Sequence, residues 1–261
     1  MFLATHGVIR NNGGGGYTAR TTAFATATGI TDVTILGALN TFDLGLISNS
    51  LDTKMKAVYP FVGTTSTTQK YNFMDSRDLD VAFRLSFIGG GTFSSNGYQL
   101  NGTNAYANTF LTPSTSLSLD SIHSSVYSRT NNILNTFDIT TAPNYTFLLG
   151  INFDGNTYFK VNQSTYSSIS TTDSLGLRII NRTSSTTEKL YKNNSLALSS
   201  SKTSASLPNT PILLGYTEGL GVTWSNRQYS FMSIGSGLTD GEAVIFYNLV
   251  QNMQTTLARN V

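Results

Sequence analysis

The chain has 261 residues, a length that suits one large domain with an extension. Only 11% of the residues are Asp, Glu, Lys or Arg, the formal net charge is +2, and no basic stretch is sustained, so nucleic-acid binding through phosphate contacts is not expected. Cysteine is absent and no apolar run reaches the roughly 18 residues of a membrane span, which excludes a disulfide framework, a thiolate metal site and membrane insertion through a helix.

The composition favours strands over helices. Ser, Thr and Asn replace the charged residues that usually cover exposed helix faces. Thr, Val, Ile, Tyr and Phe suit half-buried strands, and the 23 glycines provide many turns. These features predict a mostly β protein, a sandwich whose outer surface is rich in hydroxyl groups.

Residues 1–20 form a polar lead that contains a run of four glycines, Gly13 to Gly16. A glycine run behaves as a tether. Two interpretations remain open, a flexible terminus or an arm that becomes ordered in an assembly. The short apolar patch MFLATHGVI has no basic residues before it, so we expect no signal peptide.

The segment 21–60 is the helical candidate of the N-terminal part. Asp32 can cap a helix, because apolar residues recur after it at helical spacing. The recurring residues are Ile35, Leu36, Leu39, Phe42, Leu46 and Ile47. This stripe packs either on the sandwich or on other subunits, and Leu36, Leu39 and Phe42 are the candidate assembly residues.

Residues 61–261 show short apolar runs separated by turns, at intervals of roughly 8 to 12 residues, as in sandwiches and barrels. The most apolar run, Tyr145 to Phe153, is expected to be a central strand. Asp154-Gly155 predicts a tight turn after that strand. Asn101-Gly102 likewise predicts a hairpin between Tyr98 and Tyr106.

The stretch from Tyr229 to Met253 predicts a strand, a glycine turn and a capped helix. Thr239 lies three residues before Glu242, which is the spacing of a capping box. Apolar residues then recur on one face of the helix: Phe246, Leu249, Val250, Met253 and Leu257. We expect this face to cover the chain's own sheet, and a neighbouring subunit is the alternative.

Three carboxylates, Asp75, Asp78 and Asp80, cluster in the sequence DSRDLD. Carboxylate oxygens are good calcium ligands, but this loop lacks the glycine and the terminal glutamate of an EF-hand. Arg77 also lies among them. A solvated loop without a cofactor is therefore the expectation, and a calcium site is the alternative.

The sequence does not predict an enzyme. Glycosidases on β-sandwiches use carboxylates that alternate on one strand, and none of Glu188, Glu218 and Glu242 has a second carboxylate two residues later. Glu242 is explained by the helix cap. His123 is expected to be a histidine satisfied by its neighbours, since His6, the other histidine, is far away in the sequence.

A sugar site is the main binding hypothesis from the residues alone. Trp224, the one tryptophan, precedes Asn226 and Arg227, and an aromatic face beside an amide and a guanidinium can hold a sugar ring. The alternative is that Trp224 fills one end of the core. Tyr158 and Tyr216 are interpreted as core or rim tyrosines.

Four segments together resemble the concanavalin A-like, laminin-G-type β-sandwich. They are residues 97–106, the hairpin KLYKNNSLAL at 189–198, PILLGY at 211–216, and the closing unit at 229–247 with Leu238-Thr239-Asp240-Gly241-Glu242. They occur in the order of that family. The resemblance implies a jelly-roll β-sandwich with a small N-terminal helical segment and a short C-terminal helix.

The N-terminal part resembles the leaders of bacteriophage virion proteins, in which a short helical segment precedes a laminin-G-like domain. The segments LDTKMKAVYPFVG and LNGTNAYANTFLTP are the most similar. This resemblance implies a non-enzymatic structural protein of the virion, such as a head fibre, decoration protein or tail appendage, assembled in the host bacterial cytoplasm. Its implied partners are other virion proteins, further copies of itself, by analogy as a trimer, and a cell-surface glycan. A stand-alone carbohydrate-binding module and a glycosidase on the same fold are the alternatives.

Overall fold

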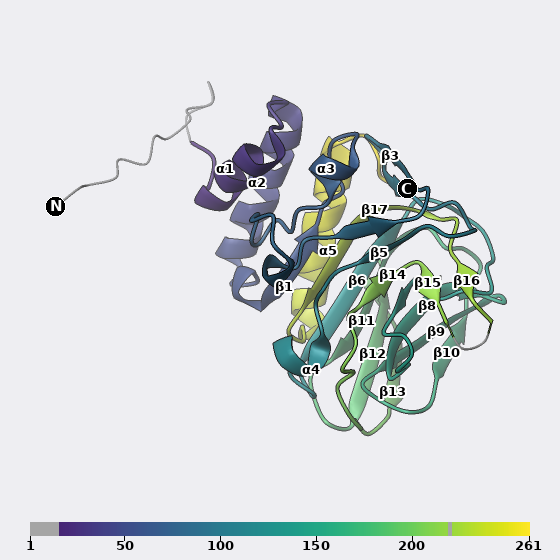
Figure 1. Cartoon of the computed structure of the whole chain (residues 1–261). Coiled ribbons are helices and arrows are strands. Elements are labelled where there is room, and N and C mark those ends of the chain that lie inside the picture. The colour runs from purple at the N-terminus through teal and green to yellow at the C-terminus, as the bar shows by residue number, and fades with distance from the viewer. Residues whose placement is uncertain (1–15, 219–220) are drawn as a thin grey trace.

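The computed structural model describes residues 16–218 and 221–261. Figure 1 shows three layers: helices, then one antiparallel sheet, then a second antiparallel sheet that faces the first. The mostly β sandwich predicted from the sequence is therefore confirmed. Within the described residues no helix is both long and apolar enough to cross a membrane.

The larger sheet has eight strands, all paired antiparallel. Its order is β13 (Ser195–Ser201), β12 (Thr187–Lys192), β11 (Gly176–Arg182), β6 (Ile122–Ser128), β17 (Gln228–Gly235), β4 (Gly97–Gln99) and β3 (Thr92–Ser94), and β1 (Met55–Tyr59) also pairs with β17. Long β6 and β17 lie at its centre and are buried along almost their whole length.

The second sheet has seven strands and carries the surface opposite the helices. Its order is β10 (Ser167–Ser170), β9 (Asn156–Val161), β8 (Phe147–Phe153), β7 (Ile139–Thr140), β14 (Leu213–Leu214), β5 (Tyr106–Asn108) and β2 (Ser86–Ile88). A small pair, β15 (Tyr216–Thr217) and β16 (Thr223–Trp224), lies beside it. Strand β8 is central and buried on both faces, as its apolar sequence predicts.

The two turns predicted from the sequence have different outcomes in the structure. Asp154 and Gly155 both have positive φ and join β8 to β9, as predicted. The hairpin predicted at Asn101-Gly102 is wrong, because β4 and β5 belong to different sheets. The Asn101 carboxamide oxygen instead accepts hydrogen bonds from the backbone N–H groups of residues 103, 104 and 105, at 2.9–3.0 Å, and this loop crosses between the sheets.

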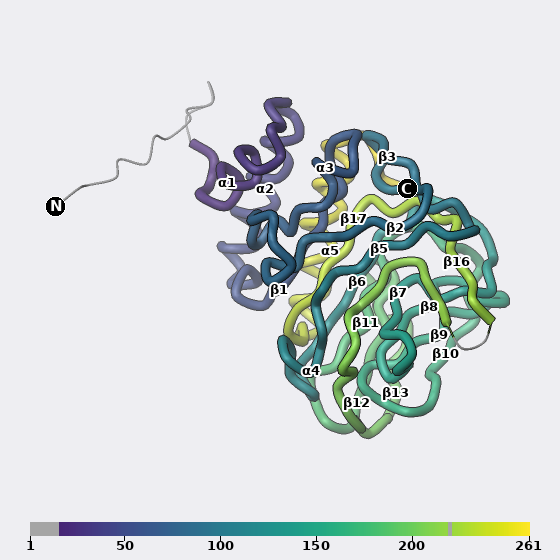
Figure 2. Tube along the Cα trace, in the orientation of Figure 1, coloured from purple at the N-terminus to yellow at the C-terminus, as the bar shows by residue number. Residues whose placement is uncertain are grey.

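The helix layer covers the outer face of the eight-stranded sheet. It contains α1 (Ala19–Thr28), α2 (Val33–Ser48) and α5 (Asp240–Thr256), while α3 (Ser66–Gln69) and α4 (Pro113–Ser116) are single turns. Figure 2 shows that α2 and α5, from opposite ends of the chain, lie side by side. Gly45 permits this approach, because a Cβ at that position would lie 2.2 Å from the Leu249 side chain. The predicted Asp32 cap is confirmed at 2.8 Å from the Thr34 N–H.

The apolar stripe of α2 packs inside its own chain. Leu36, Leu39 and Phe42 are at most 6% exposed. The Phe42 ring lies 5.8 Å from that of Phe231 on the sheet and 6.4 Å from that of Phe246 on α5. The prediction that these three residues form an assembly interface is therefore wrong: burying the stripe against the sandwich already satisfies it.

Helix α1 lies mostly within the segment 21–60 that was predicted to be helical, but its own start and end were not predicted, because its sequence ARTTAFATAT has no apolar stripe. Tertiary contacts hold it instead: Phe24 packs edge-on against Phe73 at 5.5 Å, and Arg20 forms an ion pair with the buried Asp43. Residues 1–15 of the expected N-terminal arm lie outside the described part of the chain. At the other end of the segment 21–60, Met55 begins β1, so these last residues belong to the sandwich.

The C-terminal unit forms as predicted. The Thr239 hydroxyl accepts the Glu242 N–H at 3.3 Å, and the Glu242 carboxylate accepts the Thr239 N–H at 2.7 Å. Lys54 adds an ion pair to Glu242 at 2.6 Å. Phe246, Val250 and Met253 on the apolar face of α5 are buried in the cluster that includes the chain's own sheet, and Leu249 and Leu257 pack against it partly buried.

Candidate functional site

Three aromatic rings form a half-buried platform beside the seven-stranded sheet. Tyr106 on β5 stacks on Tyr216 of β15, with ring centroids 4.9 Å apart and an interplanar angle of 28°. Trp224 on β16 pairs directly with Tyr216 across the two-stranded ladder, with ring centroids 6.3 Å apart. All three side chains are partly exposed, and none belongs to a core cluster. Trp224 therefore does not fill the end of the core.

Amide side chains gather around Asn226, which follows Trp224 by two residues. Asn226 is exposed, and its carboxamide oxygen accepts a hydrogen bond from the Asn132 carboxamide at 2.6 Å. The Gln99 carboxamide donates to the Asn226 carbonyl. Gly102, with φ of +73°, lets its loop approach closely, because a Cβ there would lie 3.2 Å from that of Asn226. Three loops thus bring the amide groups of Gln99, Asn132 and Asn226 together.

Arg227 does not belong to this surface, so the prediction that it contacts a glycan is wrong. Its side chain is fully buried, with Nη1 2.7 Å from Oδ1 of the equally buried Asp138. Its Nη2 donates to the carbonyls of Asn132 and Asn152 at 2.9 and 3.1 Å. Burial alone would lower the pKa of Arg227, but the Asp138 charge raises it above its ordinary value. Because side chains alternate where β17 begins, Asn226 faces solvent and Arg227 faces inward.

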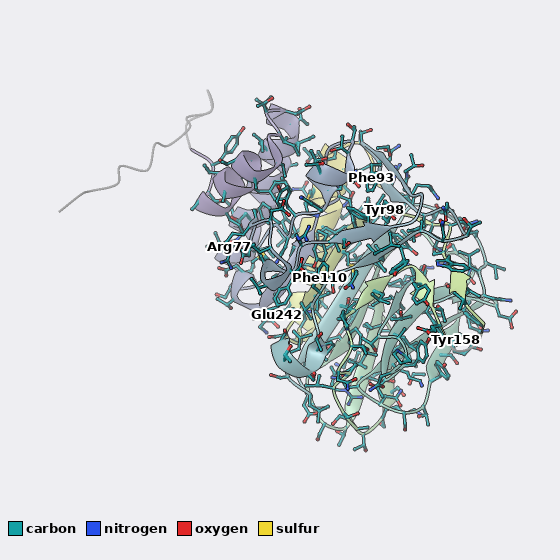
Figure 3. The ribbon with its side chains drawn as sticks, viewed as in Figure 1. Arg77, Phe93, Tyr98, Phe110, Tyr158 and Glu242 are labelled. Carbon is teal, nitrogen blue, oxygen red and sulfur yellow. The ribbon has the colours of Figure 1, made fainter. Side chains whose placement is uncertain are left out.

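A second aromatic group lies on the outer face of the same sheet. The Phe137 ring stacks on Phe153 at 5.2 Å and on Tyr166 at 6.0 Å, and Tyr158 contacts both Phe153 and Tyr166 edge-on. Gly150 makes room for it, since a Cβ there would lie 2.9 Å from the Phe137 ring. Figure 3 shows Tyr158 on the side of the molecule away from the helix layer.

Hydrogen bonds between backbone groups and side-chain hydroxyls link the segments that carry the two aromatic groups. The Phe137 N–H donates to the Thr217 hydroxyl at 2.9 Å, and the Thr140 hydroxyl donates to the Tyr216 carbonyl at 2.7 Å. The Tyr145 hydroxyl accepts the Glu218 N–H at 2.7 Å in the same region. We call these eight residues the aromatic band: Tyr106, Phe137, Tyr145, Phe153, Tyr158, Tyr166, Tyr216 and Trp224. Phe137 is the buried member of the band.

Each of the three carboxylates of the acidic loop pairs with a basic side chain. Asp75 pairs with Arg77, and its hydrogen bond with that guanidinium lowers the pKa of the Asp75 carboxyl. Asp78 pairs with Lys70 at 2.6 Å, and Asp80 pairs with Arg84 at 2.9 Å. In residues 16–218 and 221–261 no cluster of three or more His, Asp or Glu could hold a metal ion.

The other candidate acids and bases have structural partners. Glu188 is fully buried, where it accepts the Val161 N–H at 2.7 Å and the Ser167 hydroxyl at 2.6 Å, and burial raises the pKa of its carboxyl. His123 is satisfied by its neighbours, as predicted, with Nδ1 2.6 Å from the Ser236 carbonyl and Nε2 3.2 Å from the Ser233 hydroxyl.

Trp224 and Asn226 were named as candidates from the sequence, and the structure leaves both at least partly exposed, but the sequence did not indicate the other rings around Trp224. Tyr216 was interpreted as a core or rim tyrosine, and the structure places it at the rim. Tyr106 gave no signal of its own, because the strand that carries it was assigned to a hairpin. The one local hint of this position in the sequence is that Tyr106 follows the turn glycine Gly102 by four residues.

No protein-family model matches the chain, and no curated protein matches it. Solved structures are similar. Domain 4 of AbnA, a GH43 extracellular arabinanase from Geobacillus stearothermophilus, in complex with arabinotriose, has a TM-score of 0.53 at 14% identity, covering 76% of this chain and 98% of that domain. The binding domain of botulinum neurotoxin serotype D has a TM-score of 0.52 at 14% identity. The match covers 77% of this chain and 53% of the toxin domain.

A third similar structure is Trypanosoma rangeli sialidase in complex with sialic acid, with a TM-score of 0.51 at 9% identity, covering 73% of this chain and 32% of the sialidase. Identities this low show the fold alone. The two facing antiparallel sheets and these neighbours show that the chain has a lectin-like β-sandwich fold.

Proposed function

We propose that the protein is a non-enzymatic carbohydrate-binding module whose site is the platform of Tyr106, Tyr216 and Trp224. The stacked, half-exposed rings beside Asn226 carry the proposal. A sugar ring presents an apolar C–H face that packs on an aromatic face, while its hydroxyls need polar partners at the edge. Two similar structures, the AbnA domain and the sialidase, hold a sugar, which supports this class of ligand.

The residues around the platform favour binding over hydrolysis. Glycoside hydrolysis needs two carboxyl groups about 5 to 9.5 Å apart across the bond to be cleaved. Glu218 lies near Tyr216, but the side chains that border the platform on the Trp224 side, Asn132, Asn226 and Gln99, are amides. Amides can hold hydroxyl groups but cannot act as general acids or nucleophiles at neutral pH.

The Trp224→Ala variant is expected to bind glycans at least about tenfold more weakly than the wild type, because it removes the stacking face and part of the buried ring area. The measurement is a glycan array at high protein density, followed by calorimetry with the best ligand. Tyr247→Ala, which alters a half-buried ring on α5 on the opposite side, is the matched control and keeps full affinity. Equal binding by wild type and Trp224→Ala would place the site elsewhere, and release of new reducing ends would contradict the non-enzymatic assignment.

We further propose that the module is carried on a bacteriophage particle, as a head fibre, decoration protein or tail appendage, with other virion proteins and further copies of itself as partners. The support is the resemblance of the N-terminal segment to virion leaders, together with the observation that α1 and α2 precede the sandwich as in those proteins. Antibodies against this chain should label intact particles at one fixed location in electron micrographs. Unlabelled particles from cells that make the protein would overturn this part of the proposal.

A further inference from the structure

A small pocket of about 210 Å³ lies between the two sheets, on the side where β10 and β13 are the end strands. Five strands line it, with Thr157 from β9, Ile169 from β10, Arg178 from β11, Lys192 from β12 and Ala197 from β13. Side chains alternate along β9, so Thr157 faces inward to the pocket, whereas Tyr158 of the aromatic band lies on the outer face of that sheet. The pocket is therefore separate from the proposed glycan site.

Two cations share one carboxylate at this pocket. Asp173, in the loop between β10 and β11, has Oδ2 2.6 Å from Nζ of Lys192 and Oδ1 3.5 Å from Nη2 of Arg178. Arg178 is fully buried, and its other hydrogen bonds go to the carbonyls of Leu175 and Asp173, at 2.8 and 3.0 Å. In residues 16–218 and 221–261 no group accepts a hydrogen bond from its Nε. The three charged side chains thus carry one positive charge in excess.

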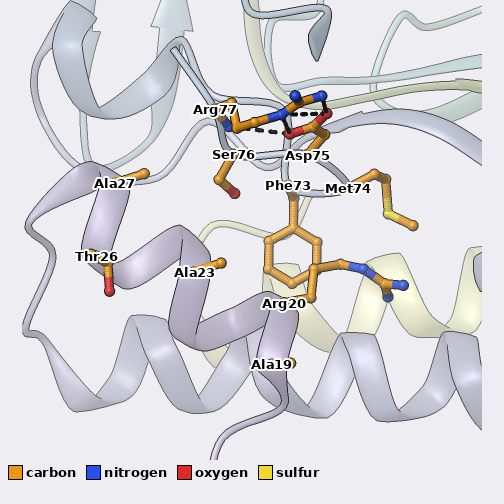
Figure 4. A pocket seen from close by; sticks show the side chains of 10 residues that line it. All are labelled: Ala19, Arg20, Ala23, Thr26, Ala27, Phe73, Met74, Asp75, Ser76 and Arg77. Carbon is orange, nitrogen blue, oxygen red and sulfur yellow. Dashed lines mark hydrogen bonds and ion pairs between the residues drawn. The ribbon is translucent and has the colours of Figure 1, made fainter. Parts of the chain in front are cut away.

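The groove between α1 and the loop of residues 73–77 differs in this respect (Figure 4). There Arg77 holds Asp75 through Nε at 2.8 Å, and Arg20 forms its ion pair with Asp43, so each cation has a carboxylate of its own. In the pocket between the sheets, by contrast, burial lowers the pKa of Arg178, and the charge of Asp173 offsets that shift only in part. A bound anion would supply the missing counter-charge.

The hydroxyl groups of the pocket suit a ligand that carries hydroxyls as well as a charge. The Thr157 hydroxyl donates to the Ile151 carbonyl at 2.7 Å, and the Thr171 hydroxyl donates to the Asp173 carbonyl at 2.9 Å. A hydroxyl that already donates keeps lone pairs, which accept hydrogen bonds from the O–H groups of a ligand. Three apolar side chains complete the lining and can pack on C–H groups: Ile169, Leu190 and Ala197.

We propose that this pocket binds a sugar acid, a single hexuronate, with its carboxylate against Arg178 and Lys192 and its hydroxyls donating to Thr157 and Thr171. The volume of about 210 Å³ is below the roughly 300–1,000 Å³ of pockets for drug-sized ligands, which fits a ligand of one sugar ring. This second site goes beyond the proposed function, because the aromatic platform offers stacking faces, whereas the pocket selects a negative charge.

Calorimetric titration of the full chain with galacturonate, glucuronate and mannuronate, each beside its neutral hexose, tests the proposal. At least one hexuronate should bind at least about tenfold more tightly than its hexose, which lacks the carboxylate. Lys192→Gln should weaken that binding at least about tenfold, and its side chain is 33% exposed, so the replacement is compatible with folding. Lys189→Gln is the matched control and keeps full affinity, because it removes the same charge from the other face of β12, where Lys189 pairs with Asp240.

Several results would overturn this inference. If no hexuronate binds more tightly than its hexose, or if the two lysine variants lose affinity equally, the pocket does not recognise the carboxylate. If acetate binds as tightly as the best hexuronate, the hydroxyls of the pocket do not select a sugar. Trp224→Ala should bind the hexuronate as the wild type does, and a loss of binding there would place the acid on the aromatic platform instead. Failure of the platform proposal leaves these expectations unchanged, since Trp224 does not line the pocket.

Discussion

Replacing Arg227 with methionine is expected to destabilise the protein by about 3–5 kcal/mol, the usual cost of leaving a buried charge without its partner. Asp138 and Arg227 are both fully buried, and their side chains are 2.7 Å apart. Asp138 also accepts the Ile151 N–H at 2.7 Å and the Tyr229 hydroxyl, so the carboxylate is fixed between the two sheets and cannot move to solvent. Urea denaturation at neutral pH measures the loss.

The double variant Asp138→Asn/Arg227→Met is the control. It removes both charges but keeps an acceptor at position 138, so it should be more stable than Arg227→Met alone. The folded fraction of Arg227→Met should bind glycans as the wild type does, unlike Trp224→Ala. An unchanged unfolding midpoint for Arg227→Met, or a double variant that is less stable than the single one, would show that this ion pair is not the anchor between the sheets.

Asn226 and Arg227 were both assigned to the candidate glycan site, and their different positions in the structure show what the sequence cannot reveal. Polar residues in SNRQY look equivalent in one dimension, but Asn226 faces solvent whereas Arg227 meets Asp138, which is 89 positions away. In the same way, helical periodicity located the apolar stripe of α2, yet the side chains that cover Phe42 include Phe231 and Phe246, which come about 200 positions later. Periodicity reveals which face is buried but not what buries it.

Features that depend on a few neighbouring residues were predictable. The caps at Asp32 and Thr239 and the turn at Asp154-Gly155 each require chemistry within four positions, and all three form. The Asn101-Gly102 loop fails as a hairpin although its glycine has positive φ, because sheet membership is decided by distant strands. The platform of Tyr106, Tyr216 and Trp224 likewise unites residues that span more than a hundred positions, so only its tryptophan was visible in the sequence.

Lowering the pH from 7 to 4 is expected to reduce the free energy of unfolding by about 3 kcal/mol through His123 alone. Burial lowers the pKa of this imidazole from 6.5 to about 4, the hydrogen bond to the Ser236 carbonyl opposes that shift, the charge of Lys54 adds to it, and Glu242 again opposes it. As the pH falls, His123 therefore becomes protonated near pH 6.5 in the unfolded chain but only near pH 4 in the folded chain. The difference corresponds to about 3 kcal/mol, and it is lost as the pH falls between these values.

The variant His123→Gln isolates this effect. It is expected to be less stable than the wild type at pH 7, because the contacts with Ser236 and Ser233 change, but the gap between the two proteins should narrow by about 3 kcal/mol as the pH falls from 6.5 to 4. Paired carboxylates such as Asp75, whose hydrogen bond to Arg77 lowers its pKa, titrate at lower pH and affect both proteins equally. Urea denaturation at half-unit pH steps gives the two curves. Parallel curves over that range would mean that the pKa of His123 in the folded protein stays near its ordinary value. The apolar contact with Phe246 and the burial of the ring between β6 and α5 argue against that outcome.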